Sequence, residues 1–338
     1  MNNMKTLAPI VIVYLNNRLP KYAIRNLVYL ELTFPERNIY VVVSQQRHAK
    51  KPHKLRRTNF VHVKEIEKYL ADLRAVTIHP QTFRNDFWNL TIARFFALES
   101  FMVEMGTKSI FHIEADVLLA PYFPFSRLEK LEKCIAFPRV SSKSAAASVF
   151  YVQDIKVLRT LNHFMKVSLL ENPNLTDMGL LSDFSSKYKR LYVPLYSGAQ
   201  APLEEIEGIF DAATFGIFLT GGDPRNNRGR IQTFRDIEDH DAKPSEYVYY
   251  FSNDDRLIAK NSSQEFEIQN LHIHSKNSKY FQKSWPSRRL IIQVEKSTYG
   301  PRTEFSVAVF LNLSYYFIIN RVKKIKKTFQ GLICRYEN

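Results

Sequence analysis

The fold of this chain is decided by residues 9–44, PIVIVYLNNRLPKYAIRNLVYLELTFPERNIYVVVS. The run 9–15 is short, apolar and β-branched without alternation, which is typical of a strand buried on both faces. A stretch with a proline at each end, 20–35, then carries apolar residues at helical spacing. Residues 38–44 read as a second buried strand. Strand, helix and strand in succession predict a βαβ unit and therefore a parallel sheet.

Further elements follow in the same alternating manner. Residues 86–105 are expected to form the longest helix, which Asn85 or Asp86 can cap and Gly106 ends. After it come three expected strands, at 108–119, 135–140 and 148–152. Helices and irregular segments are expected from there to about residue 300.

The composition excludes several classes of protein. Of 338 residues, 45% are hydrophobic and 24% charged, so a disordered chain, a collagen and a coiled coil are ruled out. Cys134 and Cys334 are too few for a disulfide framework or a structural zinc site, which indicates a reducing compartment. The apolar run near the N-terminus is short for a signal peptide and far too short for a membrane span. The cytoplasm is therefore the expected location.

The charge balance points to an anionic partner. Lysine and arginine number 48 against 33 acidic residues, a formal net charge of +15. Such an excess favours a nucleotide, a nucleic acid, a polyanionic acceptor or a membrane surface. The basic loop 47–57 is either a solvated loop or a phosphate contact. The phosphate-binding, dinucleotide-binding, zinc-protease and nucleophile-elbow motifs are absent from the sequence, which disfavours the corresponding enzyme classes.

A pair of carboxylates follows the apolar run FHI at 111–113. Glu114 and Asp116 are separated by one residue, at the end of an expected strand where open α/β sheets bind their ligands. Two acids so close repel each other unless a cation neutralises them. The pattern predicts a site for Mg²⁺ or Mn²⁺, which prefer oxygen ligands.

The segment LHIHSK at 271–276 carries the second candidate site. In an extended segment His272, His274 and Lys276 share one face, which suits a metal ligand beside a phosphate-binding lysine. An ordinary half-buried strand with a polar face would show the same alternation. Both interpretations remain open at this stage.

The third candidate site lies within 209–230. Small residues between Asp211 and Gly216 let something approach the backbone, and four of the ten glycines fall between Gly216 and Gly229. The basic residues on the following loop could bind a phosphate, a diphosphate or an acidic sugar, or could form a solvated loop. They are Arg225, Arg228 and Arg230.

Asp177, in the segment TDMGLLSD at 176–183, stands at an expected helix start. It faces the site or serves only to cap the helix.

Taken in order, these motifs resemble the layout of GT-A glycosyltransferases over roughly residues 7–285. The resemblance implies a Rossmann-like α/β fold with a mixed, mainly parallel sheet flanked by helices. It also implies that a divalent cation, Mn²⁺ or Mg²⁺, holds a UDP- or GDP-linked sugar donor. The layout is most similar to the retaining enzymes of this class.

The resemblance also implies roles for particular residues. Asp116 matches the second acid of the D-x-D motif, a metal ligand, and Glu114 stands where the first acid contacts ribose or metal. His272 or His274 matches the late metal-binding histidine, with His274 preferred because it is nearer to Lys276. Two departures are visible: glutamate replaces the first aspartate, and the late motif lacks the H-x-x-G-x-K-P-W form.

Further residues follow from the same resemblance. Asp177 matches the helix-opening acid near the donor sugar. The segment FDAATFG resembles one in bacterial surface-polysaccharide glycosyltransferases, which makes Asp211 a second candidate catalytic residue. Lys276 and Arg225 are expected to meet the diphosphate of the donor.

The expected organisation is one catalytic domain, 1–302, and a tail, 303–338. Residues 7–120 form the nucleotide-sugar half and 121–302 the acceptor half. The tail, apolar and aromatic and then strongly basic, is expected either to lie on an anionic membrane surface or to dock on the domain.

The expected function is transfer of a sugar to a glycan or lipid-linked acceptor in surface polysaccharide synthesis, at the inner face of the cell membrane and without nucleic acid. A basic nucleic-acid-binding protein or metal-dependent nuclease is the main alternative. A membrane-attached scaffold that has lost activity is another.

Overall fold

The computed structural model describes residues 7–16, 18–45, 51–198, 206–223, 225 and 239–299. The expected tail 303–338 lies outside these residues, as do Arg228 and Arg230. The elements up to the middle of the chain are β1 (Ile10–Tyr14), α1 (Lys21–Thr33), β2 (Ile39–Val43), β3 (Asn59–His62), α2 (Ile66–Val76), α3 (Phe87–Met105), β4 (Ile110–Ile113), β5 (Val117–Leu119), α4 (Phe125–Leu128), β6 (Ile135–Ser141), β7 (Ser144–Ala145) and β8 (Val149–Val152). Those that follow are α5 (Ile155–Glu171), α6 (Asp177–Lys187), β9 (Tyr192–Leu195), β10 (Ile209–Phe210), α7 (Thr214–Thr220), a 3₁₀ turn (Pro244–Glu246), β11 (Val248–Phe251), β12 (Leu257–Lys260), β13 (Glu265–His272) and α8 (Arg288–Tyr299).

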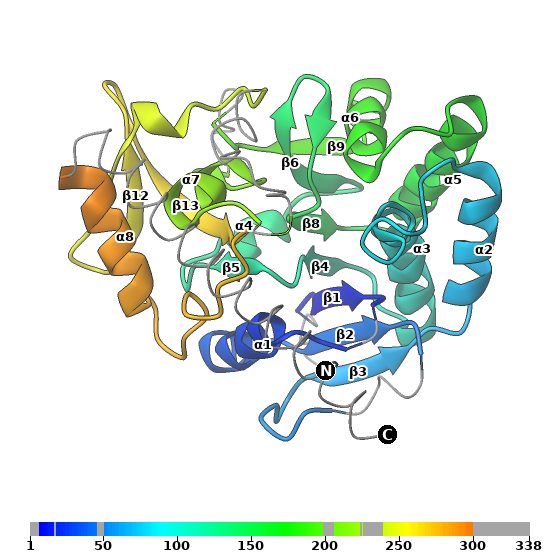
Figure 1. Cartoon of the computed structure of the whole chain (residues 1–338), viewed down its shortest axis with the longest axis horizontal. Coiled ribbons are helices and arrows are strands. Elements are labelled where there is room, and N and C mark those ends of the chain that lie inside the picture. Colours follow the sequence, from blue (N-terminus) through cyan, green and yellow to red (C-terminus); the bar gives the residue numbers. More distant parts are fainter. Residues whose placement is uncertain are drawn as a thin grey trace, which may run out of the picture.

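The larger sheet has the strand order β3-β2-β1-β4-β8-β6-β7, with β9 paired to β6 (Figure 1). The pairs from β3 to β4 and the pair β6–β9 are parallel, whereas β4–β8, β6–β8 and β6–β7 are antiparallel. The sheet is therefore mixed and mainly parallel, with helices against it, as the sequence predicts.

A second, smaller sheet has the order β10-β13-β12-β11, and β5 pairs with β13. The pair β5–β13 is antiparallel and joins Val117 to His272. Because β4 belongs to the larger sheet and β5 to the smaller one, the chain changes sheets at residues 114–116.

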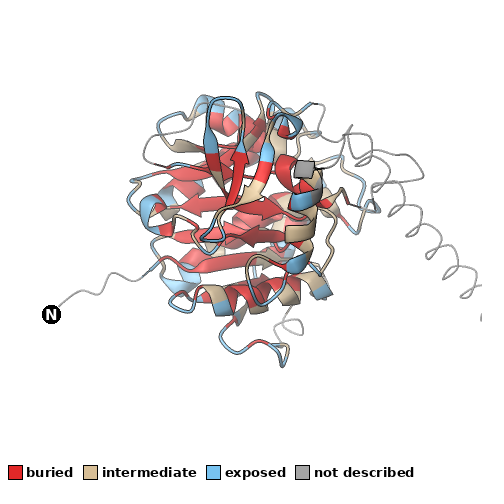
Figure 2. Ribbon diagram, turned by 90° about the vertical axis from the view of Figure 1, so that its left-hand side faces the viewer, coloured by how far each residue is buried: buried red, intermediate tan, exposed pale blue. Residues whose placement is uncertain are grey.

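Two apolar cores lie on opposite faces of the larger sheet. Val11 and Val42 point to the side covered by α2, α3, α5 and α6. Their neighbours Ile10 and Val41 point to the other side, where α1 and the smaller sheet pack. Figure 2 shows the central strands buried throughout. Alternate residues of one strand thus serve different cores, which explains why these strands read as continuous apolar runs.

Most of the expected elements are confirmed within two residues, including the helix 86–105, which ends at Gly106 with a left-handed φ of 60°. The single strand expected over 108–119 is wrong, because the chain turns between β4 and β5. The expected side-chain cap of α3 is also wrong. Asp86 makes no capping bond and instead accepts hydrogen bonds from Arg74 Nε and Asn89 Nδ2, each at 2.7 Å.

Among the helices that the structure describes, none is both long and apolar enough to cross a membrane.

Candidate active site

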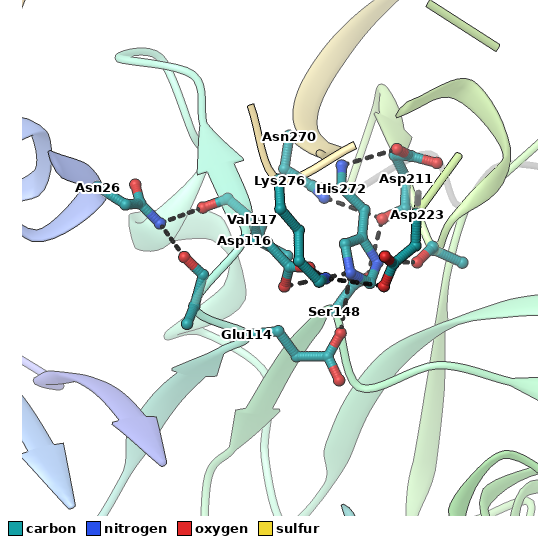
Figure 3. A network of polar contacts seen from close by, with 12 residues as sticks. Asn26, Glu114, Asp116, Val117, Ser148, Asp211, Asp223, Asn270, His272 and Lys276 are labelled. Carbon is teal, nitrogen blue, oxygen red and sulfur yellow. Dashed lines mark hydrogen bonds and ion pairs between the residues drawn. The ribbon is translucent and has the colours of Figure 1, made fainter. Parts of the chain in front are cut away.

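The turn between β4 and β5 carries the acidic pair. The backbone N–H of Glu114 donates to the carbonyl of Ser148 on the neighbouring segment. Asn26 of α1, fully buried, donates from Nδ2 to the carbonyls of Ala115 and Val117, at 3.1 and 2.8 Å (Figure 3). These bonds fix the backbone on both sides of Asp116.

His272, the last residue of β13, lies against both acids. Its Nε2 is 3.2 Å from Glu114 Oε2 and 3.4 Å from Asp116 Oδ1. Its Nδ1 lies 2.7 Å from the carbonyl of Ala212, which orients the ring. One ligand atom from each of Glu114, Asp116 and His272 can be chosen so that all lie within 4.8 Å of one another.

The charges of this triad stabilise one another. Burial opposes ionisation of Asp116, but Lys276 and then His272 hold the pKa of its carboxyl well below the usual value. Burial likewise disfavours charge on His272, yet Asp116 and Glu114 raise its pKa to about 9. The ring is therefore protonated at neutral pH, and its Nε2–H faces the carboxylates where a cation would bind.

A line of alternating charges runs from Asp116 away from the triad. Lys276 Nζ donates a hydrogen bond to Asp116 Oδ2, with which it forms an ion pair, and it lies 4.0 Å from Asp223 Oδ2. Asp223 in turn pairs with Arg225 Nη2 at 2.7 Å and with Arg84 Nη1 at 3.6 Å. Lys276 reaches this position because the chain turns after β13 and Lys276 adopts a left-handed φ of 51°.

A second line of charges runs in the other direction. The buried guanidinium of Arg94, in α3, forms ion pairs with both Glu114 and Asp177. Asp177 is the first residue of α6, whose cap is the side chain of Thr176. Asp177 is therefore free of the capping role, and Arg94 joins it to the acidic pair.

Asp211 has a different position from the one expected for a catalytic acid. Its side chain is fully buried, and its carboxylate accepts hydrogen bonds from the backbone N–H groups of Phe215, Gly216 and His272, at 2.9, 2.7 and 2.8 Å. These bonds hold the start of α7 against the end of β13. Asp211 thus positions His272 rather than facing a substrate.

His274 does not join the acidic pair in the way His272 does. The strand ends at His272, so the expected alternation over 272–276 does not continue. The centre of the His274 ring lies 4.1 Å from that of the His272 ring, and its buried Nε2 has no hydrogen-bond partner among the residues that the structure describes. Burial, then His272 and Lys276, keep its pKa well below the usual value, so the ring stays neutral. The geometry therefore favours His272 over His274 as the ligand.

The donor set suits a small divalent cation. Two carboxylates and one imidazole provide hard and borderline ligands, as Mn²⁺ and Mg²⁺ accept. The Ala212 carbonyl accepts from Nδ1, which leaves Nε2 to face a metal once its proton is lost. A protein that supplies three ligands leaves coordination positions open for substrate oxygens.

Asn26, Arg84, Arg94 and Asp223 belong to this arrangement and are absent from the predicted site residues. Asn26 is a polar residue within the apolar stripe of α1, and Arg94 has the same character in α3, so a buried polar position was a usable signal for both. Arg84 gives no such signal, because it reaches Asp223 only through three consecutive left-handed residues, 84–86.

Comparisons with known proteins give structural neighbours only. No protein-family profile and no curated sequence matches the chain. PaToxG glycosyltransferase is similar at 11% identity over 55% of this chain and 70% of that one, with a TM-score of 0.35. The WbbM bifunctional glycosyltransferase is similar at 11% identity over 58% of this chain and 41% of that one, with a TM-score of 0.36. GlyE of Streptococcus pneumoniae TIGR4 is similar at 13% identity over 93% of this chain and 64% of that one, with a TM-score of 0.42. All three are named as glycosyltransferases, the class that the sequence motifs resemble.

Proposed function

We propose that this chain is a glycosyltransferase that uses a divalent cation to move a sugar from a UDP- or GDP-linked donor to a glycan or lipid-linked acceptor. The single observation that carries the proposal is the meeting of Glu114, Asp116 and His272 where the chain changes sheets. Lys276 contacts Asp116, and Asp223 links Lys276 to Arg225 and Arg84. These are cations of the kind that bind a diphosphate.

The chemistry of such a transfer is mainly electrostatic. The bond between the sugar and the diphosphate breaks, and the leaving diphosphate gains negative charge. A bound cation would supply Lewis-acid stabilisation of that charge. Lys276 and Arg225 would bind the phosphate oxygens, and their positions are already fixed by Asp116 and Asp223.

Asp177 is the acid that the proposal places on the donor-sugar side. It is held by Arg94, which also holds Glu114, so the distance between this acid and the cation site is fixed by one guanidinium. The proposal gives no chemical step to Asp211, whose oxygens are engaged by three backbone donors.

A thermal-shift panel tests this function with the full chain. UDP, GDP and their sugar conjugates are each added with Mn²⁺ or with EDTA. Because a ligand that binds only the native state stabilises it by mass action, one of the nucleotides should raise the melting temperature in Mn²⁺ and not in EDTA.

The alternative function is tested in the same panel. Single-stranded DNA and RNA are added with Mn²⁺, and the products are run on a gel. Stabilisation by nucleic acid but by no nucleotide, with Mn²⁺-dependent cleavage, would favour the nuclease.

A further inference from the structure

Asp223 is an acid enclosed by three cations. Its side chain is 5% exposed. Arg225 donates to both of its oxygens through Nε and Nη2, at 2.7 to 3.1 Å, and its backbone N–H donates to Oδ1 at 2.9 Å. Arg84 Nη1 and Lys276 Nζ lie 3.6 and 4.0 Å from Oδ2. Burial opposes the charge of Asp223, but Arg225 and then Lys276 lower the pKa of its carboxyl.

The three cations come from three separate parts of the chain. Lys276 follows β13, Arg225 follows α7, and Arg84 precedes α3. Arg84 is placed by a left-handed turn that Asp86 secures through its bonds to Arg74 and Asn89. Positive charges from distant segments repel one another unless an anion joins them. In this structure that anion is the carboxylate of Asp223.

The cation cluster adjoins the triad. Figure 3 shows Lys276 between Asp116 and Asp223, so an anion that took the place of the Asp223 carboxylate would lie next to the lysine that Asp116 holds. Asp223 itself follows two glycines. Gly221 has a left-handed φ of 88°, and among the described residues no atom lies within 4 Å of where its Cβ would stand.

We propose that Asp223 is a specificity-determining residue that occupies the position among Arg84, Arg225 and Lys276 that the donor's diphosphate takes on binding. This inference rests on the proposed function. A diphosphate carries more negative charge than one carboxylate and can displace it, whereas a weakly charged anion cannot. Asp223 therefore lowers the affinity of the site for phosphate anions and reserves it for a diphosphate with its cation.

The test measures the binding of inorganic pyrophosphate in EDTA by calorimetry. Asp223→Asn removes the competing charge and should bind pyrophosphate at least about fivefold more tightly than wild type. Asp254→Asn is the matched control. It removes the same charge from an exposed acid that pairs with Arg256 outside the cluster. Its pyrophosphate affinity should equal that of wild type.

Equal or weaker binding of pyrophosphate by Asp223→Asn overturns the inference. If that variant does not fold, Arg84→Gln replaces it, because Arg84 is partly exposed. Arg84→Gln should weaken pyrophosphate binding by a similar factor, and an unchanged affinity also overturns the inference.

Titration of UDP and of GDP, each in Mn²⁺, separates the two proposals. Wild type that binds either nucleotide with Mn²⁺ while Asp223→Asn shows no gain in pyrophosphate affinity refutes the role of Asp223 alone. The opposite outcome is that wild type binds neither nucleotide while Asp223→Asn binds pyrophosphate more tightly. That outcome refutes the proposed function and leaves an anion site regulated by Asp223.

Discussion

His272 and His274 are two residues apart in sequence, yet their surroundings give them opposite properties. His272 faces two carboxylates and accepts a proton readily, with a pKa raised to about 9 despite its burial. His274 faces the cations His272 and Lys276 and stays neutral. A ligand atom of His272 lies within 4.8 Å of carboxylate oxygens of Glu114 and Asp116, so these three residues can share one cation and His272 is the better placed of the two.

Replacement of each histidine by alanine tests that assignment. His272→Ala should weaken Mn²⁺ binding by at least about tenfold, because one ligand atom is lost. His274→Ala should change the Mn²⁺ affinity much less. Calorimetric titration measures both. Equal Mn²⁺ affinities in the two variants would remove His272 from the ligand set.

The residues of the acidic pair, the late histidine and Lys276 could be identified from the sequence because each lies next to an apolar run. The choice between His272 and His274 could not, because it depends on where β13 ends. The last bond of its pairing with β5 runs from the Ile273 N–H to the carbonyl of Asp116, a contact between residues far apart in the chain, and the chain then turns, with the Lys276 N–H bonded to the carbonyl of Ile273. Arg84 was equally hidden, since only the turn at 84–86 brings it to the site.

At the level of elements, α7 and the end of β13 meet at Gly216. A Cβ on Gly216 would stand 2.0 Å from the carbonyl oxygen of His272 and 2.7 Å from Asp211 Oδ2. The small residues noted in the sequence are therefore needed for the approach of β13, not for that of a substrate. This approach fixes the backbone of His272.

Gly216→Ala should displace the end of β13 and so impair the cation site. Alanine is otherwise favoured over glycine in a helix by about 1 kcal/mol, so any loss of stability comes from the clash. We expect a lower melting temperature and a weaker Mn²⁺ affinity, measured by thermal denaturation and calorimetry. Gly179→Ala in α6 is the control, because its Cβ would lie 3.5 Å from Leu175 Cδ2, an ordinary contact. The account would be contradicted if Gly216→Ala had the same melting temperature and the same Mn²⁺ affinity as Gly179→Ala.

Glu31 ties α1 to the segment before β3. Its carboxylate accepts hydrogen bonds from the backbone N–H groups of Arg56, Arg57 and Thr58 and from the Thr58 hydroxyl, at 2.7 to 3.0 Å. Burial would raise the pKa of Glu31, but these bonds outweigh it and lower the pKa. The folded state therefore favours the ionised form more than the unfolded state does.

Glu31→Gln should destabilise the protein at neutral pH by about 1–3 kcal/mol, because an amide NH₂ would face backbone donors. A folded-state pKa below the unfolded value gives stability that is present above the unfolded pKa and lost as the pH falls through the folded pKa. The difference between wild type and variant should thus shrink below about pH 4.5, the ordinary value for this group. Urea unfolding across a pH series measures it. A difference that stays constant with pH would show that ionisation of Glu31 is not involved.

The break between β4 and β5 shows what the sequence of one element cannot reveal. Residues 110–119 are apolar apart from the acidic pair and His112, and they predict one strand. The strand ends at Ile113 because Asn26 binds the carbonyls of Ala115 and Val117, and because β5 pairs with β13. Both causes lie outside the segment. The βαβ unit at the N-terminus was predictable because its pairing is between neighbours in sequence.

At the scale of the whole molecule, α8 closes the part of the chain that the structure describes. Leu290 and Val294 of α8 are buried in the core that α1 and the smaller sheet share. The fold should therefore need α8. The boundary at 302 that the sequence suggests stays a prediction.

A chain ending at Arg302 should melt at the wild-type temperature and bind UDP with Mn²⁺ as wild type does. We also expect it to lose co-sedimentation with anionic liposomes at low salt, because five lysines and arginines within 321–327 are removed. A chain ending at Ser287 is the control and should be unstable without α8. Equal sedimentation of the full chain and the chain ending at Arg302 would exclude a membrane role for the tail, and an insoluble product would indicate that the tail is part of the fold.

The central claim is that Glu114, Asp116 and His272 hold a divalent cation that the donor nucleotide requires. Calorimetric titration of Mn²⁺ in the presence of UDP tests it most directly, on wild type, Asp116→Asn and the control Asp254→Asn. Asp116→Asn keeps the volume of the side chain but removes its charge, so circular dichroism should show an intact fold. We predict that wild type and Asp254→Asn bind a single Mn²⁺ ion with equal affinity and that Asp116→Asn binds it at least about tenfold more weakly, with loss of sugar transfer. Wild-type Mn²⁺ affinity in folded Asp116→Asn would contradict the account.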